Sequence, residues 1–156
     1  MRSTGQIAAS AAFAIALMLV ASTLPASAAV SCTFSSVSGV NFGAYDVFSG
    51  TTNTANGSLT VTCSGGTATA TVTLSKGNSG SYATRYMLHG ASQLDYNLYL
   101  DPFGFFIWGD GSAGTLDWGN VSITGSETLT VFGRLPAGQD VPAGSYSDTI
   151  TATVSY

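Results

Sequence analysis

The only histidine of the chain, His89, is the first residue to consider for catalysis, because an imidazole can move a proton near neutral pH. Its surroundings, Met-Leu-His-Gly-Ala-Ser, offer no obvious catalytic partner. The nucleophile motif Gly-x-Ser-x-Gly does not occur in the sequence. We therefore expect His89 to be structural and the protein not to be an enzyme.

Two acids, Asp110 and Asp117, enclose the stretch Gly-Asp-Gly-Ser-Ala-Gly-Thr-Leu-Asp and could suggest a calcium loop. Their spacing does not match that of an EF-hand. Asp-Gly is also a common signal for a tight turn between strands. We expect a turn here, and the sequence indicates no metal site and no cofactor.

The two cysteines, Cys32 and Cys63, predict a disulfide, because an even number of cysteines in an exported chain favours pairing. In the chain-entropy model, closing this loop stabilises the fold by roughly 3–4 kcal/mol. A metal site is the alternative, but there is no Cys-x-x-Cys pair and the histidine is distant.

The N-terminus has the order of a secretory signal peptide, which we predict for residues 1–28. A basic start at Arg2 precedes an apolar run, and the small residues Ala-Ser-Ala at 26–28 end it. The run is short for a transmembrane span, although a retained anchor is the alternative. Cleavage after Ala28 or Ala29 would leave one domain, residues 29–156, exported through the periplasm to the cell surface or beyond.

The charge of the chain argues against nucleic acid as a partner. Loss of Arg2 with the signal peptide would change the net charge from −4 to −5. The remaining cations, Lys76, Arg85 and Arg134, are too few and too scattered to follow a phosphate backbone. A surface this poor in charge favours packing against copies or partners.

Residues 29–156 are dominated by alternation of apolar with polar residues, rich in Thr, Val and Tyr and interrupted by glycine. "GSLTVTCS", "TATVTLSK" and the C-terminal "DTITATVSY" each place apolar residues on one face, and "LDYNLYL" places Tyr96 and Leu98 on one face and Asn97 on the other. This is the pattern of half-buried antiparallel strands. The sequence predicts an all-β sandwich of six or seven short strands.

Several stretches in order resemble the spore coat protein U family, which includes the pilin subunits of archaic chaperone–usher pili. They are "SCTFSSVSGVNFGAYDV", "LTVTCS", "RYML", "LDYNLYLD", "WGDG" and "VFGRLPAGQDVPAGSYSDTITATVSY". The resemblance runs from Cys32 to Tyr156. It implies an immunoglobulin-like antiparallel sandwich that lacks its final strand.

The resemblance also implies how such a fold is completed. A periplasmic chaperone lends a strand during transit, and a neighbouring subunit replaces it during assembly at an outer-membrane usher. The matching groove edge here is formed by Ile150, Ala152, Val154 and Tyr156. The alternative is a complete sandwich whose C-terminal strand ends the fold.

One feature departs from the family pattern. A shaft subunit should carry a donor strand of roughly a dozen alternating residues before its first cysteine. The predicted cleavage leaves only a few residues before Cys32. Such a subunit could accept a strand but not give one, which predicts a terminal, tip-like position.

The stretch "DPFGFFIWGDG", residues 101–111, concentrates aromatic side chains between two turns. Phe103 lies in the first turn, and alternation separates Phe105 and Ile107 from Phe106 and Trp108. We consider Phe103 and Phe105 candidate contacts with a hydrophobic host or abiotic surface. The alternative is a satellite cluster packed beneath the loop formed by residues 43–57.

We thus expect a structural or adhesive pilus subunit. The alternatives are a self-complete secreted coat or matrix protein, and a carbohydrate-binding module with Tyr99, Trp108 and Trp118 as its platform.

Overall fold

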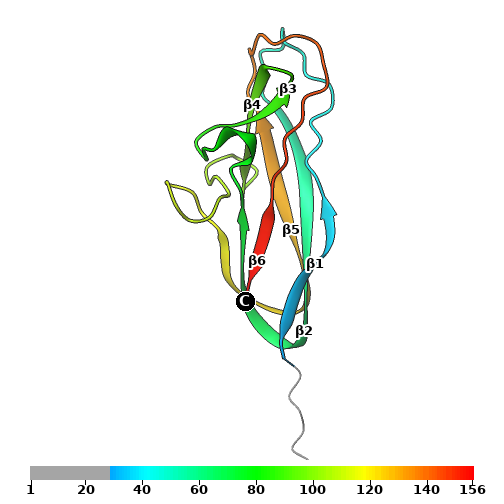
Figure 1. The fold of residues 1–156 in the computed structure, drawn as a ribbon, viewed down its shortest axis with the longest axis vertical. Helices are drawn as coiled ribbons and strands as arrows, with labels where there is room; N and C mark the ends of the chain where they lie inside the picture. Colours follow the sequence, from blue (N-terminus) through cyan, green and yellow to red (C-terminus); the bar gives the residue numbers. More distant parts are fainter. Residues whose placement is uncertain (1–28) are drawn as a thin grey trace, which may run out of the picture.

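The computed structural model describes residues 29–156, and the predicted signal peptide, residues 1–28, lies outside the described residues. Figure 1 shows an elongated β-structure with the start of β1 and the C-terminus at the same end. The elements in chain order are β1 (Ser31–Ser38), β2 (Asn53–Leu74), the 3-10 turn η1 (Gly77–Ser79), β3 (Arg85–His89), β4 (Ser92–Tyr99), β5 (Trp118–Leu135) and β6 (Ala152–Ser155). Within residues 29–156, no helix has the length and apolar character needed to cross a membrane.

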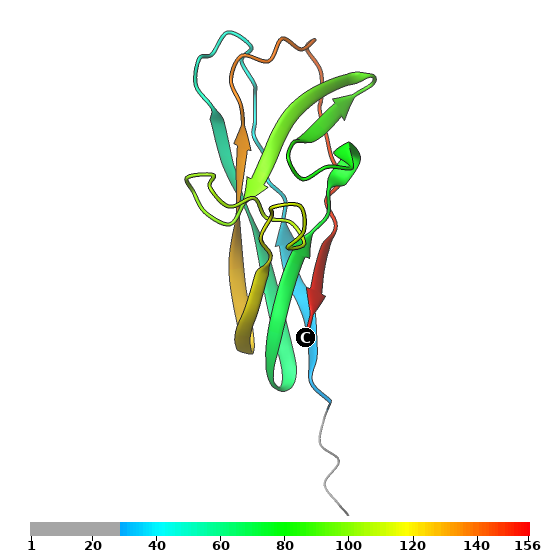
Figure 2. The ribbon, with the colours of Figure 1, turned by 90° about the vertical axis from the view of Figure 1, so that its left-hand side faces the viewer.

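The two longest strands, β2 and β5, pair antiparallel along almost their whole length and fold over together as one ribbon (Figure 2). The bend lies at Gly65 and Gly66 of β2, which have φ angles of 82° and 147°, and at Gly125 of β5 with φ 80°. Only glycine adopts such angles without strain. The predicted strands "GSLTVTCS" and "TATVTLSK" are therefore the two arms of one strand, and the prediction of uniformly short strands is wrong.

The folded ribbon supplies the middle of two facing layers. In the first layer, residues 53–63 of β2 lie between β1 and the arm of β5 at residues 125–135, which then pairs with β4. In the second layer, residues 71–74 of β2 pair with β6, and residues 68–72 pair with the first arm of β5. Every strand ladder is antiparallel, so the predicted all-β antiparallel fold is confirmed.

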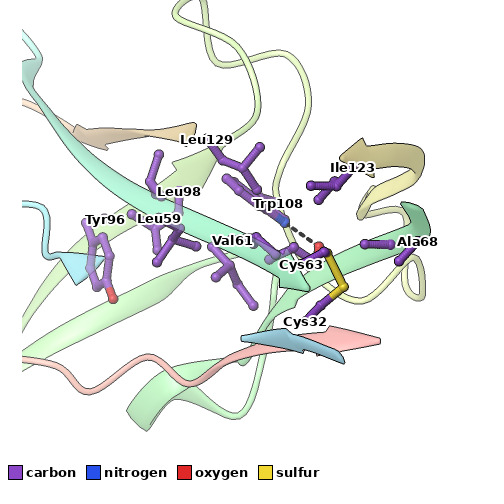
Figure 3. Close-up of a cluster of buried hydrophobic side chains, with 14 of the residues drawn as sticks. Cys32, Leu59, Val61, Cys63, Ala68, Tyr96, Leu98, Trp108, Ile123 and Leu129 are labelled. Carbon is purple, nitrogen blue, oxygen red and sulfur yellow. Dashed lines mark hydrogen bonds between the residues drawn. A yellow bond between two sulfur atoms is a disulfide. The ribbon is translucent and has the colours of Figure 1, made fainter. Parts of the chain in front are cut away.

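The core lies between the two arms of the ribbon and is shown in Figure 3. Leu59, Val61 and Cys63 face inward from the first arm, and Val72 and Leu74 face inward from the second. The side chains that complete this cluster are Cys32, Ala68, Ala70, Leu94, Tyr96, Leu98, Trp108, Ile123, Leu129, Val131 and Leu135. The alternation predicted for β2 is thus present on both arms, and each buried Val or Leu stabilises the fold by roughly 1.5–3 kcal/mol.

Three polar or charged side chains are buried in the described chain, those of Arg85, Asn97 and Thr115. Arg85 is fully buried and Asn97 is 5% exposed. The guanidinium donates to Asn97 Oδ1 at 2.7 Å, to the Trp108 carbonyl at 2.8 Å, and through two nitrogens to the Ser75 carbonyl. The expectation that Asn97 lies on an outer face is therefore wrong, because Arg85 and the segment before it cover that side of β4.

Candidate functional site

A groove of about 600 Å³ lies between β1 and the segment that leads into β6. Its floor comes from both layers, with Leu59, Leu74 and Leu98 among the buried core residues that line it. The other lining residues are Phe34, Val37, Ser38, Gly39, Val40, Phe42, Met87, Tyr96, Val131, Tyr146, Ser147, Asp148, Thr149, Ile150 and Ala152. The lining is mainly apolar, so the groove offers core side chains to any segment that enters it.

One wall of the groove is β1, which is the first strand in the order of the sheet. Cys32 and Cys63 form a disulfide and lie directly opposite each other in the ladder, with their Cα atoms 4.1 Å apart. The predicted disulfide is confirmed, and it fastens β1 to β2. The opposite edge of β1 therefore faces the groove, where Val37 is 64% exposed.

The other wall is the segment from Tyr146 to Ala152. The backbone of Ser147 exchanges two hydrogen bonds with Leu88 of β3, and Thr151 bonds with Ser75 through its N–H and its carbonyl. Backbone groups alternate between the two edges of a strand. The N–H and C=O groups of Ile150 and Ala152 consequently point toward the groove, away from β2 and β3.

The two walls run in opposite directions, because β1 pairs antiparallel with the first arm of β2 and β6 with the second arm, whose direction the fold-over reverses (Figures 1 and 2). They contact each other at the end that carries the disulfide, as Figure 3 shows. Of the four residues predicted as a groove edge, Ile150 and Ala152 line the groove. Val154 is half-buried further along β6, and Tyr156 is 58% exposed. The role of these four residues in accepting a strand stays a prediction.

A carboxylate that we did not single out in the sequence holds one wall in place. Asp148 accepts hydrogen bonds from the Tyr96 hydroxyl at 2.7 Å, from the Asn78 N–H at 2.9 Å and from the Thr149 N–H at 2.7 Å. Burial, assisted by this hydrogen bond, raises the pKa of Tyr96 far above its usual range. The only hint in the sequence is a lone acid within a strand otherwise made of Thr, Ser and apolar residues.

A second cavity of about 680 Å³ continues the groove toward the end of the molecule opposite the disulfide. The two hollows share Val40, Phe42, Met87 and Tyr146. Phe48 also lines the second cavity and is 94% exposed. The apolar surface therefore extends beyond the strands into the loops at residues 41–48 and 141–146.

The aromatic stretch after β4 is divided between the surface and the core. Phe103 is 70% exposed and Phe105 76% exposed, and their ring centroids lie 6.0 Å apart. The carboxylate of Asp101 accepts from the N–H groups of Gly104 and Phe105, and Arg134 donates to the Pro102 carbonyl. The turn is thus braced with its rings outward, and these exposures contradict the alternative of a cluster packed beneath residues 43–57.

Trp108, at the end of the same stretch, is fully buried and donates its indole N–H to the Val72 carbonyl at 2.9 Å (Figure 3). A carbohydrate platform needs an exposed ring. The expectation that Trp108 lines such a platform is therefore wrong, and Tyr99 and Trp118 are each only partly exposed.

The residues first considered for catalysis or metal binding make contacts that stabilise the fold. His89 packs against Tyr146, with 5.4 Å between the ring centroids. Asp110 accepts from the N–H and hydroxyl of Ser112 and so stabilises a turn. Within residues 29–156, no three His, Cys, Asp or Glu side chains are grouped so that they could hold a metal ion.

These features define an all-β protein with a pilin-like fold. A chain in the crystal structure of the CsuC–CsuE chaperone–tip adhesion subunit pre-assembly complex, from archaic chaperone–usher Csu pili of Acinetobacter baumannii, shares the fold with a TM-score of 0.57. The match covers 82% of the present chain and 40% of that chain, at 19% identity. It shows a common architecture.

The chain belongs to the Spore Coat Protein U domain family, whose profile matches residues 15–153. It is 35% identical over 132 residues to Protein U of Myxococcus xanthus, and the match covers 75% of this chain and 71% of that protein. The resemblance seen in the sequence is confirmed. The protein thus carries a spore coat protein U domain.

Proposed function

We propose that this protein is an exported surface subunit that accepts a β-strand from another chain in the groove between β1 and the segment from Tyr146 to Ala152. The observation that carries the proposal is that the edges of two extended segments face each other across one apolar groove. Strand edges with free N–H and C=O groups bind extended segments, and the apolar lining of the groove adds the affinity. The sandwich would then be incomplete by one strand.

The strand would come first from a periplasmic chaperone and afterwards from a neighbouring subunit, with an outer-membrane usher as the site of exchange. The chaperone and tip adhesion subunit named for the Acinetobacter baumannii complex support this assignment by analogy of fold. Because the two walls run in opposite directions, an inserted strand is antiparallel to one wall and parallel to the other.

The test uses residues 29–156 exported to an oxidising periplasm without a chaperone. A synthetic peptide that alternates threonine with valine or leucine should raise the melting temperature and the soluble yield. Ile150→Asp should weaken peptide binding by at least about tenfold, because it places a charge in the apolar wall. The matched control Thr153→Asp changes an exposed residue that does not line the groove. A cooperative monomer indifferent to the peptide would instead indicate a self-complete coat or matrix protein.

Adhesion to hydrophobic host or abiotic surfaces is the second candidate function, and the exposure of Phe103 and Phe105 favours it. Each ring contributes about 1.5–3 kcal/mol when buried, before the costs of association. The double variant Phe103→Ser with Phe105→Ser should lose adhesion to a hydrophobic resin. Exchange of the exposed Phe48 for Ser serves as the control, because it removes an equal ring elsewhere.

A terminal, tip-like position forms part of the same proposal. It rests on the few residues that separate the predicted cleavage site from Cys32. N-terminal sequencing of the exported protein tests it, since a start well before Ala28 would leave residues that could serve as a donor strand.

A further inference from the structure

We infer that the strand that fills the groove carries a basic side chain, Lys or Arg, at the inward-facing position beside Asp148. This inference rests on the proposed strand acceptance and adds the chemistry of the partner. It predicts one cation at one place in a strand whose other inward side chains are apolar.

The first observation is the isolation of the charge. Among the described residues that line the groove, Asp148 is the only one with a charged side chain. The wall opposite consists of Phe34, Val37 and Val40 with small residues between them. A single carboxylate in such a lining can select the residue that a partner strand places beside it, because charge complementarity selects partners more strongly than apolar contact does.

The second observation is that the Asp148 carboxylate can accept at least one further hydrogen bond. Oδ1 accepts from the N–H groups of Asn78 and Thr149, and Oδ2 accepts from the Tyr96 hydroxyl. A carboxylate offers about four acceptor positions. All three donors are neutral, so they orient the charge without compensating it.

Arg85, which contributes a favourable charge interaction with Asp148, is already engaged. Its guanidinium donates to Ser75, Asn97 and Trp108 and lies in the core. Asp148 is partly exposed, so that water can reach its carboxylate. A strand inserted beside it would displace that water.

An uncompensated carboxylate becomes costly once it is covered, whereas a paired one does not. Lys and Arg suit this position, because their aliphatic stems pack on apolar side chains while the charged end reaches the carboxylate. At every other inward position of the strand the same residue would place its charge against apolar lining. The groove should therefore reject a basic residue everywhere except beside Asp148.

The experiment scans a lysine through the inward positions of the alternating peptide and measures the affinity of each peptide for residues 29–156 by calorimetry. One position should retain or exceed the affinity of the parent peptide, and the others should lose about tenfold or more. Glutamate at the permitted position should bind at least about tenfold more weakly than lysine. This comparison needs no variant of the protein.

The assignment to Asp148 comes from the ratio of lysine-peptide to parent-peptide affinity, which is insensitive to a general loss of binding. Asp148→Asn should lower this ratio about tenfold. Tyr96→Phe, which leaves Oδ2 to the peptide, should raise it. Glu127→Gln removes an exposed acid that does not line the groove and should leave the ratio unchanged.

Rejection of lysine at every inward position, or a permitted position that does not respond to Asp148→Asn, would overturn the inference while the parent peptide still binds. Failure of the parent peptide to bind would overturn the proposed strand acceptance itself, and the inference with it.

Discussion

The hydroxyl of Tyr96 donates a 2.7 Å hydrogen bond to Oδ2 of Asp148 and so joins β4 to the wall of the groove that leads into β6. The same carboxylate accepts from the Asn78 N–H, next to a glycine, Gly77, at which any side chain would collide with it. One acid therefore fixes the C-terminal wall, β4 and the turn η1 relative to one another. The shape of the groove depends on this contact.

Removal of the Tyr96 hydroxyl should change how stability responds to alkaline pH. The folded state raises the pKa of Tyr96 above the ordinary value of about 10, so the folded state keeps a proton that the unfolded chain releases. The contribution of Tyr96 to the free energy of unfolding should be fully present below about pH 9 and should be lost progressively above about pH 10.

Tyr96→Phe should be less stable near neutral pH by about 1 kcal/mol and should lose less stability above pH 10. Urea unfolding at several pH values measures both effects. Tyr82 and Tyr99, whose pKa values are also raised mainly by burial, should leave a residual slope in the variant. Identical pH profiles for the two proteins would contradict the expectation.

Loss of the disulfide should destabilise the protein by roughly 3–4 kcal/mol, because Cys32 and Cys63 enclose a loop with a sequence separation of 31 residues. Cys32→Ala combined with Cys63→Ala provides the comparison without free thiols. Thermal unfolding of the oxidised protein, the reduced protein and the double variant should give one high and two similar low melting temperatures.

Arg85→Lys should cost about 2–4 kcal/mol although it preserves the charge. The guanidinium serves three acceptors in fixed directions, and an ammonium cannot reach all of them from the same backbone position. Chemical denaturation measures the loss. Lys76→Arg is a suitable control, since Lys76 lies near the surface and contacts the Tyr82 ring.

Substitutions in the aromatic stretch after β4 should differ sharply in their effect on stability, depending on whether the ring is exposed or buried. Phe103→Ser and Phe105→Ser should each change the free energy of unfolding by no more than about 0.5 kcal/mol, because both rings are exposed. Trp108→Ala should cost about 3–5 kcal/mol, because the ring is fully buried. Equal effects at the three positions would contradict the arrangement described.

The alternation of β2 was enough to predict which residues face the core, because period-two patterning reports burial directly. Cys32 and Cys63 were predicted as a pair from their number and the export signal. The fold-over of β2 and β5 was not predicted. The pair Gly65 and Gly66 fits a turn between two separate strands as well as a bend within one strand, and the sequence does not distinguish the two.

The polar features of the site depend on contacts between distant segments, and a single sequence does not contain that information. Asn97 follows the alternation of an outward residue, yet Arg85 and the carbonyls of Tyr82 and Ala83 enclose it. The role of Asp148 similarly depends on Tyr96 and Asn78, which are 52 and 70 residues away in the chain. Exposure of Phe103 and Phe105 also required the structure, because alternation fits either a covered or an open strand.

The Cys32–Cys63 bond has a mechanical consequence for a protein that bears load. Tension applied to the chain before Cys32 crosses the bond between the two sulfur atoms and enters β2 at Cys63. Residues 33–62, which include most of β1 and the adjoining wall of the groove, lie outside that force path. A pull from the N-terminal side would therefore be transmitted through the chain from Cys63 onward. The β1 wall of the groove would stay unloaded.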